Sequence, residues 1–518
     1  MTTADHGLRD GLPIREWYAS EDRPKPIRDR YAKLKALRDL GVEPYAYSYA
    51  PTHDLVAALE AYVEDAEQPE RVRVAGRMLS IRDMGKSVFA HLGDHKGRLQ
   101  IYCKRDRMAD LDSSVLGLID LGDWVGVEGP LFRTRTGEVT VHVESLVLLS
   151  KTLRPLPLGK TEVLDDGTEV VHSGFADVEM RYRQRYADLA TNPRVRDVFA
   201  ARARIVRALR QVLDKDGFLE VETPILQPIY GGAFARPFTT HHNTLDRTLY
   251  LRIADELYLK RLIVGNLDRV YEIGKVFRNE GLDRTHNPEF TMLELYQAYA
   301  DYEDMMEMSE RLVAAAVDAV LDEPVVEWNG LRIDLAAPWE RISFHDAIKR
   351  FSGVDGISGS PEELLNALPD GAEGGEDLSR SQLLEEIFST VVERNLVNPT
   401  IVFDYPIEMS PLAKPKRGNP DLAERFEVFV GGTELINAFS ELNDPIDQWD
   451  RFTDQAQARA AGDREAQCLD VDYVRALEYG LPPTGGLGLG VDRLVMLLTG
   501  QSTIRDVLLY PVMRDVDD

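Results

Sequence analysis

Short segments of alternating apolar and polar residues recur between residues 71 and 148. They span residues 72–78, 87–92, 97–102, 124–129 and 138–143, and turn residues separate them. Alternation with period two is typical of strands that bury one face. The only long helical pattern in this region lies near residues 111–121. Five short strands with one helix predict a small closed β-barrel.

The pattern on either side of these strands predicts how the chain divides. Residues 26–40 have the spacing of a basic helix that Gly41 ends, and the chain becomes helical again from residue 179. We therefore expect a flexible N-terminal extension over residues 1–25 and the helix with its barrel over residues 26–150. Residues 151–178 predict a linker, and residues 179–518 a larger domain with a surface insertion at about residues 345–398.

The most informative segment reads as a hairpin over residues 271–296. Alternation puts Arg278 and Glu280 on one face of its first strand. On the second strand one face carries Phe290, Met292, Glu294 and Tyr296. Spacing alone favours an ordinary hairpin with a solvated charged face. If both faces instead line one pocket, its cation, carboxylates and rings suit a nucleotide and a charged small molecule.

Composition limits the classes of protein that this chain can belong to. It has 518 residues, 44% of them hydrophobic and 29% charged, as in a globular protein with room for two or three domains. No apolar run approaches the roughly 18 residues that span a membrane, and the N-terminus does not resemble a secretory signal. Only Cys103 and Cys468 occur, without a CxxC motif, which disfavours a disulfide framework or cysteine-bound zinc. We expect a cytoplasmic protein.

The formal charge of −27 is unevenly distributed. Residues 1–150 hold 21 Lys and Arg against 24 Asp and Glu, a net −3, which leaves −24 for residues 151–518. Residues 71–107 hold 10 basic against 3 acidic residues, a local +7. A solubilising charge bias explains the acidic part well but explains the basic segment less well. An acidic body with one basic module suits a nucleic acid that is held mainly at one end.

Three stretches resemble the conserved motifs of the class II aminoacyl-tRNA synthetases, in the family's order. The string FRNEG from residue 277 and the string HNPEF from residue 286 are similar to motif 2 in its lysyl form. Residues 217–224 (GFLEVETP) resemble motif 1 and residues 486–498 (GLGLGVDRLVMLL) resemble motif 3. The family implies an α+β multidomain fold: an N-terminal five-stranded OB β-barrel and a C-terminal class II synthetase domain on an antiparallel β-sheet flanked by helices. It also implies a homodimer.

The resemblance implies that ATP and an amino acid condense to an aminoacyl-adenylate, whose acyl group then passes to tRNA. In the matching positions Arg278 would hold the α-phosphate of ATP and Arg493 the γ-phosphate. Glu280 would accept a hydrogen bond from the adenine amino group, Phe290 would stack on the ring, and His286 would touch the phosphate tail. The attacking carboxylate is already an anion, so no general base is needed.

The family also implies divalent metal. Glu427 and Glu434 flank a glycine pair and match its Mg²⁺ ligands, with more than one ion per active site expected. Without the resemblance, a salt bridge or a solvated face would be the better interpretation of these two carboxylates. We expect neither zinc nor an organic prosthetic group.

The expected amino acid is lysine. Glu441 lies in the Phe-Ser-Glu-Leu stretch whose glutamate binds the lysine ε-ammonium in the lysyl family, helped there by Tyr296 and Glu294. The other residues implied for lysine binding are Gly232 in a mobile loop, Glu256 for the α-ammonium, and Asn437. Ile436 and Ala438 are bulkier than the residues usual beside Asn437 and could reshape the rim of the pocket.

The alternatives are an aspartyl- or asparaginyl-tRNA synthetase and a catalytically silent relative that binds RNA. Aspartate-specific relatives carry an arginine near the position of Glu441, so the sign of this residue discriminates between them. A silent relative should have lost ATP or metal residues, and all of them are present. The resemblance to the lysyl family implies that the protein binds tRNA(Lys), ATP and L-lysine, and that it has no membrane partner.

The barrel would read the anticodon of the tRNA. Arg82, Phe89, Gln100 and Glu144 match the lysyl family's anticodon positions. Phe89 would stack on a uracil and Gln100 would read its edge. Any one of the four could equally be a routine residue on the surface of a barrel.

Overall fold

A computed structural model describes residues 8–163, 169–172, 174–369, 379–460 and 468–514 of the chain. Contacts divide these residues into two units. The first holds the described residues up to Arg181 together with Tyr186–Thr191. The second holds Tyr182–Arg185 and the described residues from Asn192 onward. Each has its own hydrophobic core.

The first unit is built around a closed β-barrel, as the alternating segments predict. Its strands are β3 (Arg71–Asp83), β4 (Ser87–Gly93), β5 (Arg98–Lys104), β6 (Trp124–Arg133) and β7 (Val139–Val143). They pair in the order β3-β4-β5-β7-β6, and β6 pairs back with β3 to close the barrel. Helix α4 (Asp110–Leu118) joins β5 to β6. A further strand, β8 (Ser145–Ser150), pairs with β6 and was not expected.

The N-terminal part has more regular structure than the sequence predicts. The basic helix is α2 (Lys25–Asp39), close to its expected bounds, and α3 (Leu55–Glu60) precedes the barrel. Residues 8–25 also form β1 (Leu8–Arg9), β2 (Leu12–Pro13) and α1 (Ile14–Ala19), where we expected none. Trp17 stabilises this part: its ring is buried, and the guanidinium carbons of Arg9 and Arg23 lie 3.9 and 4.7 Å from its centroid. Residues 1–7 lie outside the described residues.

The segment expected to be a linker also contains regular structure. Strands β9 (Lys160–Val163) and β10 (Glu169–His172) pair as an antiparallel hairpin. The residues between them, 164–168, and residue 173 lie outside the described part. Two short helices follow, α5 (Val178–Arg183) and α6 (Arg185–Thr191).

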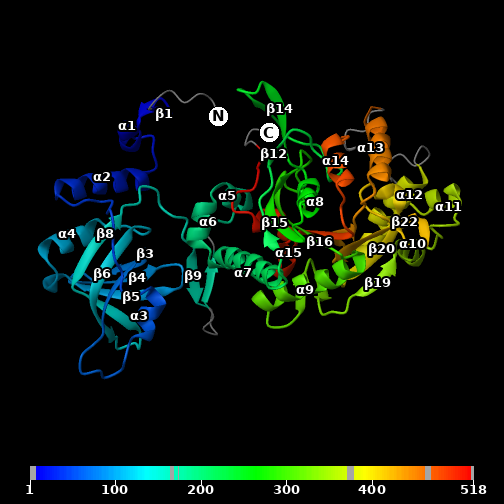
Figure 1. Cartoon of the computed structure of the whole chain (residues 1–518). Helices are drawn as coiled ribbons and strands as arrows, with labels where there is room; N and C mark the ends of the chain where they lie inside the picture. Colours follow the sequence, from blue (N-terminus) through cyan, green and yellow to red (C-terminus); the bar gives the residue numbers. More distant parts are fainter. Residues whose placement is uncertain (1–7, 164–168, 173, 370–378, 461–467, 515–518) are drawn as a thin grey trace. The chain divides into compact units, whose positions relative to one another are not determined.

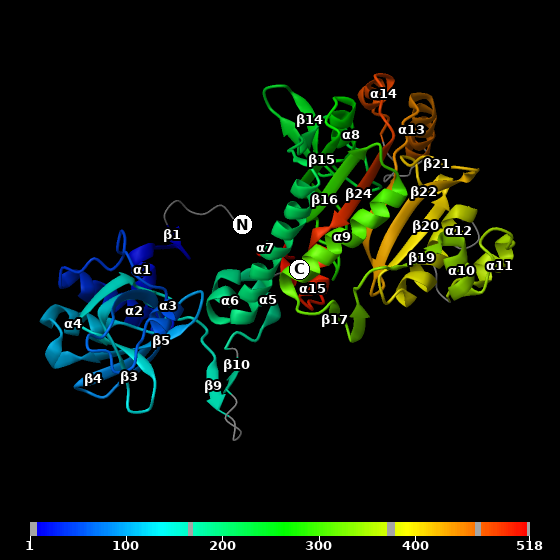
Figure 2. The ribbon, with the colours of Figure 1, turned by 60° about the horizontal axis from the view of Figure 1, so that its bottom comes forward.

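The second unit contains a mixed sheet that is largely antiparallel (Figures 1 and 2). The strand order is β11-β15-β16-β24-β23-β22-β20-β19, and β21 pairs with β22. Only the outer pairs β11 with β15 and β19 with β20 are parallel. The strands are β11 (Leu219–Glu220), β15 (Arg269–Phe277), β16 (Glu289–Ala298), β24 (Thr484–Gly490), β23 (Thr433–Ser440), β22 (Asn419–Val430), β21 (Pro415–Lys416), β20 (Thr400–Pro406) and β19 (Glu340–Ser343). A separate small sheet has the order β12-β14-β13, with β12 (Leu226–Gln227), β13 (Thr239–His242) and β14 (Arg247–Leu251).

Helices cover both faces of the large sheet. On one face pack α7 (Pro193–Lys215), α9 (Tyr302–Val320), α15 (Val491–Leu498) and α16 (Ile504–Val507), which share the largest core with β16 and β24. On the other face lie α8 (Glu256–Val264), α13 (Pro445–Ala460) and α14 (Val471–Glu478), around a smaller core. In Figure 1, α9 runs below the strands while α13 and α14 lie above them. The small hairpin β17 (Val325–Trp328) and β18 (Leu331–Asp334) follows α9.

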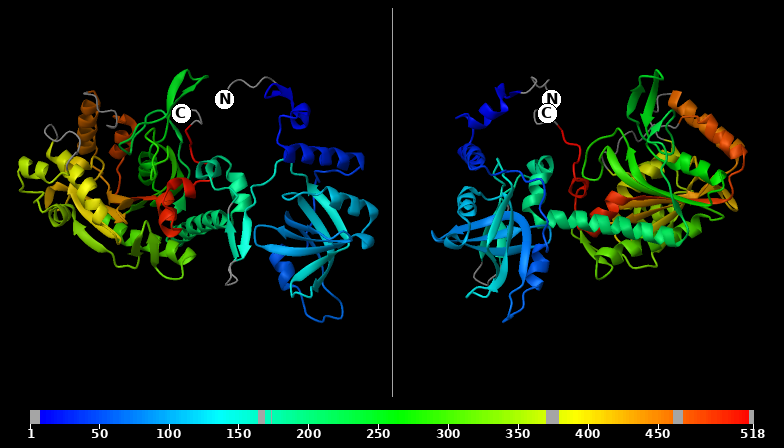
Figure 3. Two further views of the ribbon diagram at one scale, coloured as in Figure 1. Left: turned by 180° about the vertical axis from the view of Figure 1, so that it is seen from behind. Right: turned by 60° about the vertical axis from the view of Figure 1, so that its left-hand side comes forward.

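The expected surface insertion corresponds to a helical cluster beside β19 and β20. It contains α10 (Phe344–Ser352), α11 (Pro361–Asn366) and α12 (Arg380–Ile387), followed by a π-turn and a 3₁₀ turn up to Asn395. These helices pack around a core of their own with Phe344, Phe388 and Tyr405 at its centre. Figure 3 shows these helices in yellow, beside the end of the large sheet where β19 and β20 lie. Residues 370–378 lie outside the described part.

The alternation of β16 decides which residues face the core and which face the opposite side. Leu293 and Leu295 are fully buried against the helices α7 and α9. The even-numbered residues of the strand point to the other face, as the sequence predicts. Across the described residues, no helix combines the length and the apolar character of a membrane span.

Candidate active site

A cavity of about 380 Å³ opens on the face of the large sheet that the even-numbered residues of β16 reach. Its walls come from β16, β22, β23 and β24, from the start of α8, and from the segments around Gly232 and Pro411. Every residue that the sequence predicts for nucleotide, metal or amino-acid binding lines this cavity. These residues are Gly232, Glu256, Arg278, Glu280, His286, Phe290, Glu294, Tyr296, Glu427, Glu434, Asn437, Glu441 and Arg493.

Sheet register brings these residues together from distant parts of the chain. Glu427 of β22 is paired with Asn437 of β23, Asn437 with Gly488 of β24, and Gly488 with Glu294 of β16. A second row runs parallel to it through Arg425, Phe439, Gly486 and Tyr296. Both rows cross β24 at a glycine. The glycines leave the middle of the sheet open, with polar side chains on either side.

Gly486 has to be a glycine because the carboxylate of Glu441 lies where its side chain would be. A Cβ atom at this position would stand 1.9 Å from Oε1 of Glu441 and 2.6 Å from the ring of Tyr296. Oε1 is fully buried and has no hydrogen-bond partner within the described part of the chain. The strand that resembles motif 3 therefore makes room for a carboxylate aimed at the cavity.

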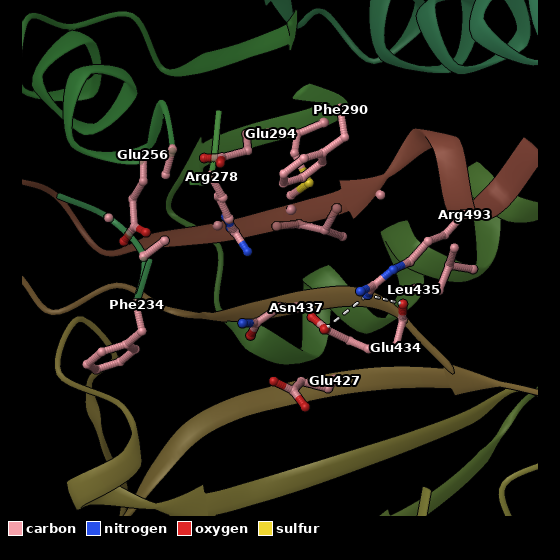
Figure 4. Close-up of a pocket in the computed structure, with 18 of the residues that line it drawn as sticks. Phe234, Glu256, Arg278, Phe290, Glu294, Glu427, Glu434, Leu435, Asn437 and Arg493 are labelled. Carbon is pink, nitrogen blue, oxygen red and sulfur yellow. Dashed lines mark hydrogen bonds and ion pairs between the residues drawn. The ribbon is translucent and has the colours of Figure 1, made fainter. Parts of the chain in front are cut away.

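One end of the cavity carries cationic and aromatic side chains. Arg278 follows the last residue of β15, and its guanidinium carbon lies 5.2 Å from the ring centroid of Phe290. Arg493 extends from the first turn of α15 and donates to the backbone oxygen of Glu434 at 2.7 Å and to its carboxylate at 3.2 Å. Figure 4 shows Arg493 and Glu434 at one end of the cavity, Glu256 toward the other, and Arg278 and Asn437 between them.

His286 is held beside Arg493. Its Nδ1 lies 2.7 Å from the carboxylate of Asp283, and its Nε2 lies 3.4 Å from a guanidinium nitrogen of Arg493. Partial burial would raise the pKa of Asp283, but hydrogen bonds from His286 and from backbone N–H groups lower it to about 2. Asp283 is therefore an anion at neutral pH and fixes the orientation of the imidazole ring.

The two carboxylates that resemble metal ligands face the cavity from neighbouring strands. Both oxygens of Glu427 are engaged: Arg425 donates to Oε1 at 2.5 Å and the hydroxyl of Tyr405 donates to Oε2 at 2.8 Å. Arg425 also reaches Asn437, 3.1 Å from its Oδ1. Carboxylate oxygens from two residues suit Mg²⁺, which takes few protein ligands and completes its shell with phosphate and water. Among the described residues, no group of three or more acidic, histidine or cysteine side chains is placed to hold a metal without such additions.

The third carboxylate nearby belongs to Glu393, at the start of the turn that ends the insertion helices. Burial and repulsion by Glu427 and Glu434 raise the pKa of Glu393 to about 8. Burial, and after it the negative charge of these two neighbours, therefore favours the protonated form of Glu393 at neutral pH.

The other end of the cavity is acidic and deeply buried. Glu256, in the first turn of α8, and Glu441, just after β23, both form ion pairs with Lys260 of α8. The hydroxyl of Tyr296 donates to Glu294 at 3.1 Å. Behind Glu294 lies Asp255, a fully buried carboxyl whose pKa is raised by burial. This end is suited to positively charged groups, because carboxylates outnumber the cations beside them.

The residues predicted for the anticodon lie on the barrel. Arg82 of β3 is paired across the strands with Phe89 of β4, and Phe89 with Tyr102 of β5. The rings of Phe89 and Tyr102 are 4.7 Å apart. Gln100 shares the face of β5 with Tyr102; its amide donates to Glu138 at 2.6 Å and accepts from Thr140 at 2.8 Å. The structure thus brings three of the predicted residues onto one face of neighbouring strands.

Glu144 does not lie on the neighbouring strands that carry those three residues. It lies between β7 and β8, and its carboxylate accepts a hydrogen bond from Arg71 at 2.6 Å. That partner lowers the pKa of Glu144 and keeps it charged. His142 lies two residues before Glu144, and its ring centroid is 5.5 Å from that of Tyr102, which packs against Phe89.

Comparison with known proteins assigns the chain to one family. The model of the class II tRNA synthetases of D, K and N type matches residues 177–514, and that of the OB-fold nucleic-acid-binding domain matches residues 72–149. The chain belongs to the class II tRNA synthetases. The barrel of the first unit is their OB-fold domain, and the second unit contains their catalytic sheet.

Relatives with curated names are similar along nearly their whole length. The lysine–tRNA ligase of Pelotomaculum thermopropionicum is 52% identical over 95% of this chain and 96% of its own. That of Moorella thermoacetica is 50% identical over 94% and 98%, and that of Thermoanaerobacter pseudethanolicus 48% over 97% and 98%. The resemblance that the motifs indicate is thereby confirmed.

Two expectations for this synthetase site need correction. Strand β15 ends at Phe277, so Arg278 and Glu280 lie in the loop after it rather than on the face of a strand. They reach the cavity because Arg278 is still held to the end of β16, where its backbone N–H donates to Pro288 at 2.9 Å. Ile436 and Ala438 do not line the rim, because alternation turns them away from Asn437 into the core.

Sequence reasoning also missed several side chains that shape the synthetase site. Arg425 and Lys260 hold the predicted carboxylates in place, and Tyr405 comes from a strand with no motif. Spacing could have found the first two. Arg425 is two residues before Glu427 on one strand face, and Lys260 is one helical turn after Glu256. No local signal points to Tyr405.

Proposed function

We propose that the protein is a lysine–tRNA ligase, which activates L-lysine with ATP and transfers it to tRNA(Lys). The supporting observation is the polarity of the cavity. Its buried acidic end suits ammonium groups, and its cationic and aromatic end suits a nucleotide. The near-complete likeness to relatives named lysine–tRNA ligase supports the same substrate.

In the first step an oxygen of the lysine carboxylate attacks the α-phosphorus of ATP. The bond from that phosphorus to the oxygen bridging to the β-phosphate breaks, and pyrophosphate leaves with the electron pair. Arg278 binds the α-phosphate and Arg493 the γ-phosphate, while Phe290 stacks on the adenine. Glu280 accepts from the adenine amino group, and His286 contacts the phosphate tail. The attacking group is already an anion, so these residues act by position and charge.

Glu427 and Glu434 would hold Mg²⁺ together with the phosphates, with more than one ion per site. When bound, the metal would supply positive charge next to the phosphate oxygens. Arg425 and Tyr405 fix the orientation of Glu427 from behind. Arg493 donates to the carboxylate of Glu434 at 3.2 Å, which supports roles for both side chains at the same end of the cavity.

Glu441 pairs with the ε-ammonium of lysine, assisted by Glu294 and Tyr296. Glu256 takes the α-ammonium, Asn437 contributes a polar contact between the two ends, and Gly232 lets its loop close over the substrate. Gly232 has φ +86°, a backbone conformation that favours glycine. An aspartate or asparagine substrate has no side-chain ammonium to bring to Glu441, whose buried charge would then lack this partner.

The OB-fold unit binds the anticodon of the tRNA. Phe89 stacks on a base, Gln100 reads its edge, and Arg82 and Glu144 complete the contacts. The excess of basic residues between positions 71 and 107 supports a phosphate-rich partner on this barrel.

A second copy of the chain completes the enzyme as a homodimer. Apolar side chains are exposed in and just after the segment that resembles motif 1: Leu219 on β11, an edge strand of the large sheet, and Ile225, Leu226 and Ile229 in the residues that follow. Exposed apolar patches of this kind mark protein interfaces. The thiols of Cys103 and Cys468 are free, which fits a protein that works in the cytoplasm. Sedimentation equilibrium at micromolar concentration tests the dimer.

Amino-acid-dependent exchange of pyrophosphate into ATP, measured across the twenty amino acids with and without Mg²⁺, tests the activity. We expect exchange with lysine alone and only with Mg²⁺. Exchange with aspartate or asparagine would refute the substrate, and no exchange with any amino acid, with or without added tRNA, would refute the activity. Transfer to tRNA is tested by charging of a tRNA(Lys) transcript.

A further inference from the structure

Lys260 is a buried cation that bridges two of the carboxylates proposed for lysine. The side chain is fully buried, and its Nζ lies 2.5 Å from Oε1 of Glu256, one turn earlier in α8. The same nitrogen forms an ion pair with Oε2 of Glu441. The ring of Phe439 lies 5.2 Å from the nitrogen and that of Tyr296 lies 6.0 Å away. The protein thus places an ammonium of its own between the two carboxylates expected to bind those of the substrate.

The charges in this group do not cancel. Lys260 supplies one positive charge, and Glu256 and Glu441 together supply two negative ones. The other titratable or charged groups that face it are Glu294, Tyr296, Tyr473 and Arg425. Arg425 is paired with Glu427, so it does not neutralise this group. When both glutamates are ionised, one negative charge is therefore left for a cation that enters from the cavity.

Lys260 also opposes protonation of Glu441. Burial raises the pKa of the Glu441 carboxyl well above its ordinary value, and Lys260 counteracts that rise. Burial alone would lower the pKa of Lys260, but attraction to Glu256 and Glu441 raises it, so the ammonium stays charged. An isolated buried carboxyl would take up a proton, and a neutral acid binds a cation poorly.

We propose that Lys260 is a positioning residue for amino-acid selection: through its two ion pairs it holds Glu256 and Glu441 toward the cavity and favours their charged forms, so that they can receive the substrate's ammonium groups. Lys260 does not itself contact the substrate. It acts through the two glutamates. This inference rests on the proposed lysine specificity and extends it to a residue outside the cavity wall, since Lys260 does not line the cavity.

The test replaces the charge and measures the lysine KM, the ATP KM and kcat in pyrophosphate exchange between pH 7 and 9. For Lys260→Met we expect a lysine KM raised at least about tenfold at pH 7, since each unit by which the pKa of Glu441 exceeds the assay pH costs about tenfold in its ionised fraction. The ATP KM should change by less than about twofold. As pH rises toward 9, Glu441 ionises, and the lysine KM of the variant, taken relative to that of the unaltered protein at the same pH, should fall.

The barrel offers a matched control. Lys151 is also fully buried and also pairs with two carboxylates, those of Asp120 and Asp123 at 2.5 and 2.8 Å. Lys151→Met should lower the melting temperature and leave the lysine KM unchanged at every pH. Lys260→Arg, which keeps a positive charge, should have a lysine KM that follows that of the unaltered protein at every pH.

A lysine KM in Lys260→Met that stays within twofold of the unaltered value, or one that rises equally at all pH values, would overturn the inference. If the methionine variant does not fold, Lys260→Gln carries the same test, because its amide donates hydrogen bonds without charge. If neither variant folds, while Lys260→Arg folds and has the lysine KM of the unaltered protein at every pH, Lys260 would be assigned to stability instead. Absence of lysine-dependent exchange by the unaltered protein would refute the proposed function itself.

Discussion

The exchange of Glu441 for glutamine tests the acidic end of the cavity most directly. Glu441 is 1% exposed, and its Oε1 has no partner among the described residues, while Oε2 faces Lys260. The substitution keeps the shape of the side chain and removes one charge. We expect it to weaken lysine binding and to leave the nucleotide end of the cavity, where Phe290 and Arg493 lie, unaffected.

The magnitude follows from the burial of this carboxylate. Truncating one partner of a buried charge pair costs about 2–5 kcal/mol, because the remaining charge is left without its counter-ion. At about 1.4 kcal/mol per factor of ten, this corresponds to a lysine KM raised roughly 30- to 3,000-fold. Values near the lower end are expected, because Glu294 and Tyr296 also face the incoming ammonium and remain in place.

Pyrophosphate exchange with one substrate varied at a time measures both constants. Glu280→Gln is the matched control: it makes the same chemical change at the other end of the cavity, and should raise the ATP KM while leaving the lysine KM within about twofold. Equal increases of both constants in Glu441→Gln would refute the division of the cavity into an ammonium end and a nucleotide end.

Three further predictions test other parts of the molecule. Glu434→Gln should raise the Mg²⁺ concentration for half-maximal exchange by about tenfold or more, since it removes one of few protein ligands; an unchanged midpoint would contradict the metal assignment. Phe89→Ala should raise the tRNA KM in charging about 5- to 150-fold through lost base stacking of about 1–3 kcal/mol, with pyrophosphate exchange unaltered. The raised pKa of Glu393, about 8, means that the folded protein holds a proton that the unfolded chain releases above about pH 4.5, so unfolding free energy falls as pH rises from there to about 8. Glu393→Gln should therefore raise the melting temperature more at pH 8.5 than at pH 5, and an equal change at both would argue against the shift.

The sequence by itself determined the local elements and the family. Alternation with period two was enough for the five barrel strands and for the face shared by Phe290, Met292, Glu294 and Tyr296. The ordered motifs were enough for the class II family. Both signals are local, because strand alternation and motif strings depend on neighbours within about ten residues. Where no local signal existed, as for β8 and for the helix α1 that Trp17 anchors, the prediction failed or was not made.

Only the tertiary structure decided how the site is assembled. Strand register places Glu427, Asn437 and Glu294 in one row around Gly488, although more than a hundred residues separate the first two from the third. Burial decides that Lys260 faces two carboxylates rather than solvent, and packing decides that Arg425 and Tyr405 hold Glu427. These relations depend on long-range pairing and on the loss of water around charges. Neither can be read from spacing along the chain, because both arise only when distant segments pack against one another.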